Sequence, residues 1–301
     1  MIDLAGLVDL VAEHRADLDL PVAPFTVGGV AHDTDTTPAL MGIVNLSQDS
    51  WYRDSVAPST TSAVRRGKVL AAQGAAFVDV GAESVDLTTA RVGPADQVAA
   101  LVPVIEELTT AGVVVSVESY EPEVVRASLV AGARILNLTG STQDDAMFDL
   151  AAEHGASLVL CHVTGGHARD LDDAAVETDP LPQMLDQFAA RVDNARSRGV
   201  DAGICVDPGI GFGYLRLDVA AERYRHQAVV LLNTFRLRRL GLPVCHALPS
   251  AFDIFEDQMR TAEGFFAVLA SLGRTGIYRT HEVPHVSAVL TAMGMLSAKA
   301  P

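Results

Sequence analysis

Four polar residues each end a short run of apolar or β-branched residues in this sequence: Asn45, Glu118, Asn137 and Asp207. A carboxylate accepts two hydrogen bonds from a planar group that carries adjacent N–H donors, and an amide can both donate and accept. If the fold gathers these side chains in one cavity, they can bind the edge of a flat nitrogen heterocycle.

The residues after Asp207 suit such a site. The stretch 206–213 reads Val-Asp-Pro-Gly-Ile-Gly-Phe-Gly, which places an acid at the tip of a strand and a glycine-rich turn directly after it. Glycines let the backbone lie close to whatever the acid binds. Phe212 adds an apolar contact for a ring.

A second group of residues is suited to an anion. Arg279 offers planar bidentate donors, His281 adds one more, and the amide oxygen of Asn45 is a ligand that Mg²⁺ accepts. Together they predict a diphosphate site, with Mg²⁺ bound through the diphosphate.

Alternating strand and helix patterns would position these residues. From residue 39 onward, short apolar runs alternate with helical patterns of ten or more residues. The expected strands are 40–44, 77–80, 113–117, 134–137, 157–161, 203–206, 243–246 and 277–279. The expected helices are 61–73, 95–111, 121–131, 144–154, 182–198, 221–240, 258–272 and 284–296, most of them ended by a glycine such as Gly155, Gly241 or Gly273.

Eight such units with strands apolar throughout predict a TIM (β/α)8 barrel over residues 39–301, with a doubly wound open sheet as the alternative. Residues 1–38, with one short strand at 25–31, are expected to form an N-terminal extension that caps the barrel. The polar residues above would then share the rim at the C-terminal ends of the strands. The acidic stretch 164–180 is expected to be a solvated loop or a lid over that rim.

Composition excludes several classes of protein. The net charge of −16 argues against nucleic acid or an anionic membrane as a partner. No apolar run approaches the ~18 residues of a membrane span, and the N-terminus lacks the basic flank of a signal peptide. The odd number of cysteines, each inside an apolar run, indicates reduced thiols and a cytoplasmic location.

The cysteines also leave a metal site open as an alternative. Cys161, Cys205 and Cys245 fall in three successive expected strands, with His162 and His246 beside two of them. Soft ligands of this kind can bind zinc. Buried cysteines that fill a barrel core are the simpler interpretation.

Five motifs resemble those of the dihydropteroate synthase family, the pterin-binding barrels. The motifs are Met-Gly-Ile-Val-Asn-Leu-Ser-Gln-Asp-Ser-Trp (41–51), Asp-Val-Gly-Ala-Glu-Ser (79–84), Ser-Val-Glu-Ser (116–119), Gly-Ala-Arg-Ile-Leu-Asn (132–137) and Arg-Thr-His (279–281). With the Asp-Pro-Gly-x-Gly-Phe-Gly string, the resemblance covers nearly all of residues 39–296. It implies a pterin-binding transferase of folate biosynthesis that works as a homodimer.

The resemblance also implies roles for individual residues. The pterin is expected to contact Glu118, Asn137, Cys161, Asp207 and Phe212, and the diphosphate to contact Asn45, Arg279 and His281. Catalysis is expected to involve Asp79, Arg279 and His281, and Asn45 is the expected Mg²⁺ ligand.

Two motifs of the family are missing from the chain. The family's Ser-Arg-Lys after the seventh strand is replaced by a run from Cys245 to Phe252 without lysine or arginine, and Val85 follows Glu-Ser where the family has Thr-Arg-Pro-Gly. Because a neutral residue cannot repeat a bidentate or stacked cation, this pattern favours a divergent member whose second substrate is not p-aminobenzoate.

Three functions agree with this pattern. The favoured one is alkylation of an amine by a 6-hydroxymethyl-dihydropterin diphosphate. The alternatives are a non-catalytic pterin-binding paralogue and a methyltetrahydrofolate-type methyltransferase. Arg279 and His281 count against methyl transfer, because it requires no diphosphate site.

Overall fold

Eight parallel strands form a closed barrel at the centre of the computed structural model, which describes residues 3–47, 56–85, 89–170, 177–211 and 219–297. The strands are β3 (Ala39–Asn45), β4 (Phe77–Gly81), β5 (Val115–Glu118), β6 (Ile135–Leu138), β7 (Ser157–Cys161), β8 (Ile204–Asp207), β9 (Cys245–Ala247) and β10 (Ile277–Thr280). Neighbours pair in the order β8-β7-β6-β5-β4-β3-β10-β9. A parallel bridge between Val206 of β8 and Val244, the residue before β9, brings the two ends of this order together.

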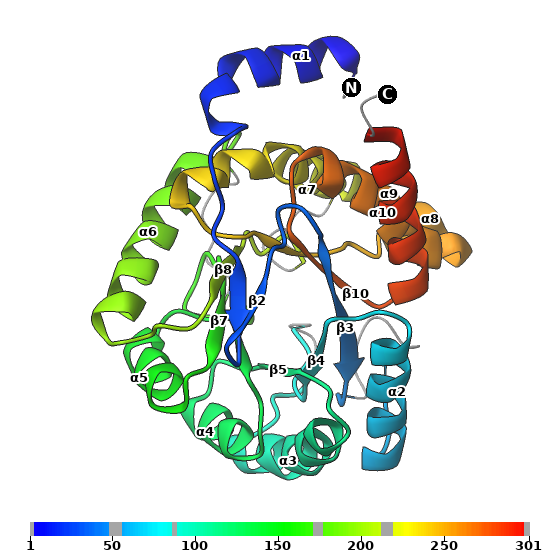
Figure 1. Cartoon of the computed structure of the whole chain (residues 1–301). Helices are drawn as coiled ribbons and strands as arrows, with labels where there is room; N and C mark the ends of the chain where they lie inside the picture. Colours follow the sequence, from blue (N-terminus) through cyan, green and yellow to red (C-terminus); the bar gives the residue numbers. More distant parts are fainter. Residues whose placement is uncertain (1–2, 48–55, 86–88, 171–176, 212–218, 298–301) are drawn as a thin grey trace.

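Helices surround the barrel and cover the outer faces of its strands (Figure 1). They are α2 (Thr60–Ala72), α3 (Pro94–Thr110), α4 (Pro122–Val130), α5 (Asp144–His154), α6 (Leu181–Ser197), α7 (Ala220–Asn233), α9 (Met259–Leu272) and α10 (Val283–Ser297), with a short α8 (Phe252–Phe255) before α9. The predicted TIM barrel is therefore confirmed, with most boundaries within two residues of the sequence pattern.

Two details of the helices differ from the prediction. The helix expected at 221–240 ends at Asn233 and continues as a 3₁₀ helix, η3 (Thr234–Leu240), and a second one, η4 (Glu256–Gln258), precedes α9. Gly155 and Gly241 end their helices with positive φ as expected. Gly273 does not (φ −80°), and Arg274 takes the left-handed conformation instead, with φ 67°.

The N-terminal residues form a helix, α1 (Leu4–Glu13), a 3₁₀ turn, η1 (Arg15–Asp17), and a hairpin of β1 (Phe25–Val27) and β2 (Val30–His32). The single strand expected at 25–31 is wrong, because Gly28 and Gly29 adopt positive φ and turn the chain back. The hairpin crosses the barrel in Figure 1, and Thr26 O accepts hydrogen bonds from Gly203 N (2.8 Å) and Ser157 Oγ (2.7 Å). It therefore packs where β7 and β8 begin, at the end of the barrel opposite the predicted site.

Apolar side chains pack inside the barrel and also between its strands and the surrounding helices. Phe25 of the hairpin meets Phe77 edge to face, with ring centroids 5.8 Å apart. Phe25 and Phe77 belong to a cluster of buried residues that also includes the thiols of Cys161, Cys205 and Cys245. Within the described ranges, no group of three His, Cys, Asp or Glu residues is arranged to hold a metal ion.

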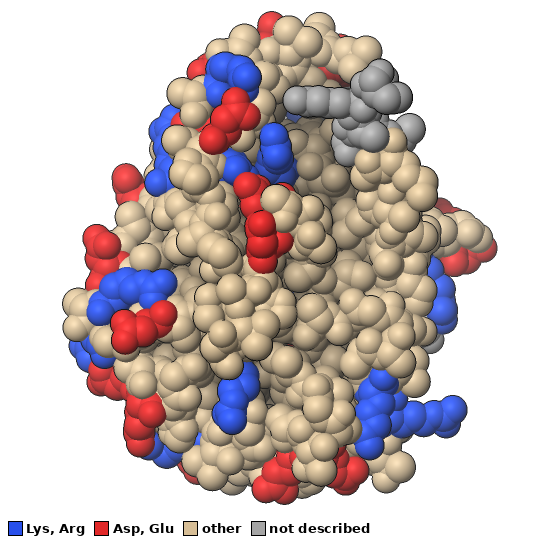
Figure 2. Space-filling view, in the orientation of Figure 1, with Lys and Arg blue, Asp and Glu red and all other residues tan. Residues whose placement is uncertain are grey.

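The negative charge of the chain does not gather on the face that carries the hairpin. Figure 2 shows acidic and basic side chains interspersed mainly around the periphery of this face, with a largely uncharged centre. Of the helices in the described ranges, none has the length and apolar character needed to cross a membrane.

Candidate functional site

A cavity opens at the C-terminal ends of the barrel strands. Four of the predicted site residues line it: Asn45, Glu118, Arg279 and His281. They come from β3, β5, β10 and the turn after β10. One part of the lining is largely apolar and includes Tyr224, Leu248, Pro249, Ala251 and Phe252. The cavity thus joins a polar wall to an apolar one, as ligand sites for ring compounds commonly do.

A buried carboxylate, Asp79, is the centre of a hydrogen-bonded network beneath this cavity. Its Oδ1 accepts from Ser116 Oγ at 2.5 Å, and its Oδ2 accepts from Asn137 Nδ2 at 2.9 Å and from Arg279 Nη1 at 3.3 Å. Asn137 Oδ1 in turn accepts from Cys161 Sγ at 3.2 Å. Strands β4, β5, β6, β7 and β10 therefore each place one member of the network inside the barrel.

Asp207 is buried at the tip of β8, as the glycine-rich motif predicted. Its Oδ1 accepts from Gly209 N at 2.8 Å, in the tight turn that follows Pro208. No described residue hydrogen-bonds to its Oδ2. Burial raises the pKa of Asp207 to about 6, and the nearby Arg279 guanidinium limits the rise. This oxygen is a buried acceptor without a described hydrogen-bond partner, beneath the residues that line the cavity.

Glu118 stands at the polar wall with its carboxyl fixed by Thr139. Thr139 Oγ1 donates to Glu118 Oε1 at 2.6 Å. Burial raises the pKa of Glu118 to about 7, the Thr139 hydrogen bond opposes the rise, and Asp79 adds to it. Its strand neighbour Gly81 makes room for it, since a Cβ on Gly81 would lie 2.7 Å from Glu118 Oε2.

Arg279 is the cation of the barrel interior. Burial alone would lower its pKa, but the carboxylates of Asp79 and Asp207 outweigh this effect and raise it. The guanidinium therefore stays charged at all ordinary pH. No described residue hydrogen-bonds to its Nε. Arg279 balances the two buried acids and still reaches the cavity.

His281 also lines the cavity, and a buried carboxylate holds its ring in place. Its Nδ1 lies 2.7 Å from Oε1 of Glu263, a fully buried residue of α9. The ring orientation is thus set by a carboxylate that the sequence pattern did not single out.

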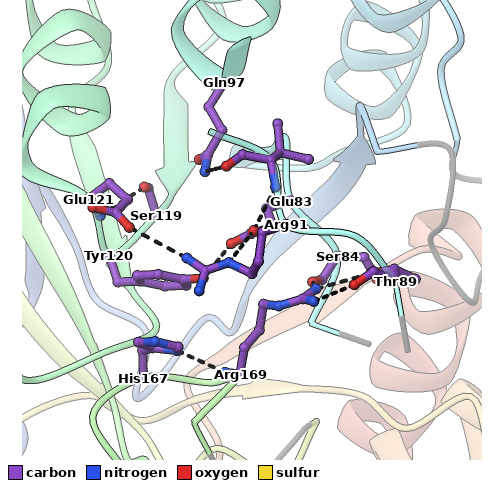
Figure 3. Close-up of polar contacts among 11 residues, drawn as sticks. Glu83, Ser84, Thr89, Arg91, Gln97, Ser119, Tyr120, Glu121, His167 and Arg169 are labelled. Atoms are coloured by element: carbon purple, nitrogen blue, oxygen red, sulfur yellow. Dashed lines mark hydrogen bonds and ion pairs between the residues drawn. The ribbon is translucent and has the colours of Figure 1, made fainter. Parts of the chain in front are cut away.

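A second polar cluster borders the cavity at the ends of β4, β5 and β7 (Figure 3). Glu83 accepts from Arg91 Nε at 2.7 Å and from the hydroxyl of Tyr120, and His167 stacks on Tyr120 with ring centroids 4.3 Å apart. The Tyr120 hydroxyl and the Arg91 guanidinium lower the pKa of Glu83 despite its partial burial. This cluster orders the rim beside Glu83, which lines the cavity.

The same figure shows how the loop after β7 holds the loop after β4. Arg169 donates to Thr89 O at 2.7 Å, to Thr89 Oγ1 at 3.0 Å and to the carbonyl of Ser84. Part of the stretch 164–180 therefore lies over the rim, although residues 171–176 are outside the described part of the chain.

The predicted site residues fall into two layers. Asn45, Glu118, Arg279 and His281 line the cavity, whereas the buried lower layer contains Asp79, Asn137, Cys161 and Asp207. Phe212 lies outside the described residues. Because the two layers share Arg279, they form one continuous site.

Sequence reasoning missed several residues that complete this site. Ser116 and Thr139 fix the carboxyls of Asp79 and Glu118, and both stand within two residues of a predicted site residue. Glu263 lies far from the motifs. Its only sequence signal is an acid inside the apolar face of α9, where a charge would be costly without partners.

Comparisons with known proteins agree with this geometry. A family model described as "Pterin binding enzyme" matches residues 41–247. Dihydropteroate synthase of Mycobacterium leprae is 32% identical over 252 residues, which cover 81% of this chain and 88% of that protein. The Bacillus subtilis dihydropteroate synthase is 29% identical over 269 residues, covering 86% and 89%.

Solved structures give the same result. Xanthomonas albilineans dihydropteroate synthase in complex with indole-2-carboxylic acid and 6-chloroguanine matches with a TM-score of 0.73 and 27% identity, over 93% of this chain and 99% of that one. The same enzyme in complex with 7,8-dihydropteroate matches with a TM-score of 0.71 and 26% identity, over 92% and 100%. The chain belongs to the dihydropteroate synthase family of pterin binding enzymes.

Proposed function

We propose that this protein is a pterin-binding transferase that alkylates an amine with 6-hydroxymethyl-dihydropterin diphosphate. The observation that carries the proposal is the position of Arg279, which lines the cavity together with Glu118, hydrogen-bonds to Asp79 and faces Asp207. Asn137 bonds to the same Asp79 oxygen. In this reaction a C–N bond forms at the pterin methylene carbon, the C–O bond to diphosphate breaks, and the amine loses a proton.

Asp207 is the proposed partner of the pyrimidine edge of the pterin. Its two carboxylate oxygens, of which Oδ2 has no described hydrogen-bond partner, can accept from the ring N–H and the amino group together. Asn137 and Glu118 would complete the contacts, Cys161 would pack beside them, and Phe212 would cover the ring. Asn137 would exchange its present bond to Asp79 for the ligand, while Asp79 keeps Arg279 in place.

The leaving diphosphate is the proposed partner of Arg279, His281 and Asn45, which share one wall. Charged donors aimed at the departing oxygens stabilise the charge that develops there, and the enzyme needs no covalent nucleophile. Asn45 supplies an oxygen donor but not a full metal site, which fits Mg²⁺ because this ion commonly binds through substrate phosphates and one or two protein oxygens. Bound Mg²⁺ would neutralise part of the diphosphate charge.

The second substrate is proposed to differ from p-aminobenzoate. The wall that faces it includes Leu248, Ala251 and Phe252, and its cation Arg223 is already paired with Asp253. The proposal also includes a homodimer and a reducing compartment such as the cytoplasm, the latter supported by cysteines that form no disulfide.

Calorimetric titration with the pterin diphosphate, with and without Mg²⁺, tests the proposal. We expect binding by the wild-type protein and a loss of about a hundredfold or more in Asp207→Asn, which removes a charge-assisted pair of hydrogen bonds. Turnover with p-aminobenzoate should be weak beside that with other amines. Absence of pterin binding would overturn the function, and vigorous dihydropteroate formation would overturn the altered second substrate.

A further inference from the structure

The Glu263 carboxylate makes an unusually complete set of contacts for a buried acid. The side chain is fully buried on α9. Its Oε2 accepts from His281 N at 3.0 Å, from Glu282 N at 3.2 Å and from the Thr280 hydroxyl, and its Oε1 lies 2.7 Å from His281 Nδ1. All four donors belong to the three residues that end β10 and begin the next turn.

This concentration of donors has an energetic reason. A buried carboxylate is costly unless hydrogen bonds and a positive partner compensate for its lost hydration. The backbone N–H groups and the Thr280 hydroxyl supply the hydrogen bonds. The His281 ring, whose side chain is only 14% exposed, lies against the remaining carboxylate oxygen.

The contact also determines how the ring can act. A hydrogen bond from Nδ1–H to a carboxylate fixes the orientation and protonation of an imidazole, so that the other nitrogen, Nε2, is the one that reaches a ligand. His281 lines the cavity beside Arg279. Glu263 therefore holds the ring by one nitrogen and leaves the other as the ring atom through which His281 can meet an anionic group in the cavity.

We propose that Glu263 is a positioning residue that holds His281 with a proton on Nδ1 and so turns Nε2 toward the leaving diphosphate, to which Nε2 donates when a second proton makes the ring a cation. The diphosphate part of this inference rests on the proposed function. The orientation of His281 by Glu263 is a property of the free protein and can be tested without any substrate.

The first test is ¹⁵N NMR of the histidine-labelled wild-type protein, with the His281 signals assigned from the spectrum of His281→Gln. We expect a protonated Nδ1 in the wild type, and a change in the Nδ1 and Nε2 signals in Glu263→Gln. A wild-type ring without a proton on Nδ1 would overturn the proposal, whether or not any Glu263 variant folds.

The second test is calorimetric binding of inorganic pyrophosphate to the wild type, Glu263→Gln, His281→Gln and the double variant. Glu263→Gln keeps the size of the side chain but removes its charge. We expect it to weaken binding by about ten- to a hundredfold, the range found when a metal-ligating histidine loses its outer hydrogen-bond partner. The double variant should bind no more weakly than His281→Gln alone.

A purely structural role gives different results. Unchanged affinity in a folded Glu263→Gln protein, or an equal further loss in the His281→Gln background, would overturn the inference. Glu263→Asp retains the charge, and should retain more affinity than the glutamine variant. If the wild type fails to bind pyrophosphate but shows the Nδ1 proton and its dependence on Glu263, the diphosphate site fails and the orientation of His281 stands.

Discussion

Arg279 Nη1 lies 3.3 Å from Asp79 Oδ2 and so connects β10 to β4 across the intervening strand β3. The side chains are 13% and 3% exposed. A complete buried ion pair lowers the stability of the fold little, but loss of one partner leaves the other charge buried without compensation. We expect Arg279→Met to lower the free energy of unfolding by roughly 3–5 kcal/mol, measured by urea denaturation.

The matched variant for this pair is Asp79→Asn in the Arg279→Met background. Removing the orphaned acid should recover part of the lost stability, although Asp207 still faces the missing cation. A loss below about 1 kcal/mol in the single variant would contradict the burial argument.

The protonation of Asp207 should control pterin affinity. Burial raises the pKa of this carboxyl to about 6, and only the ionised form accepts two hydrogen bonds from the pterin edge. Affinity should therefore rise as the pH increases through about 6 and then level off. Calorimetry at several pH values, corrected for the titration of the ligand itself, should give this curve for the wild type and a flat one for Asp207→Asn.

Glu118 should make the protein less stable at alkaline pH. Its pKa in the folded state is about 7, above the ordinary value of 4.5, so the fold favours the protonated acid. Its stabilising contribution is full below about 4.5 and is lost as the pH rises through about 7. Glu118→Gln should match the wild type at pH 4.5 and exceed it by roughly 1 kcal/mol at pH 8, since the cavity partly hydrates the carboxyl. Equal unfolding curves at pH 8 would count against the shift.

Gly81 should accept a side chain at lower cost when Glu118 is shortened. A Cβ at position 81 would lie 2.7 Å from Glu118 Oε2, so Gly81→Ala must push the carboxyl away from Thr139. We expect a loss of about 1 kcal/mol, the net contribution of the Thr139 hydrogen bond that the displaced carboxyl gives up. In the Glu118→Asp background the same substitution should cost less. Additive effects in this double-mutant cycle would show that the two side chains do not meet.

Local patterns in the sequence were sufficient for the fold. Apolar runs at regular spacing and the glycines after helices predicted the order and nearly all the positions of the barrel elements. Short-range physics decides such features, because strand burial and helix ends depend on residues close in the chain. The hairpin was missed in part because Gly28 and Gly29 follow only three strand residues.

By itself, the sequence also determined which polar residues stand at the strand ends, and the barrel then placed Asn45, Glu118, Arg279 and His281 on one cavity. Only the tertiary structure decided their partners. The Arg279–Asp79 pair, 200 residues apart, and the Glu263–His281 contact depend on how β10 lies against β3 and α9. A hydrogen bond needs two atoms within about 3 Å, and sequence spacing cannot fix that distance between separate elements.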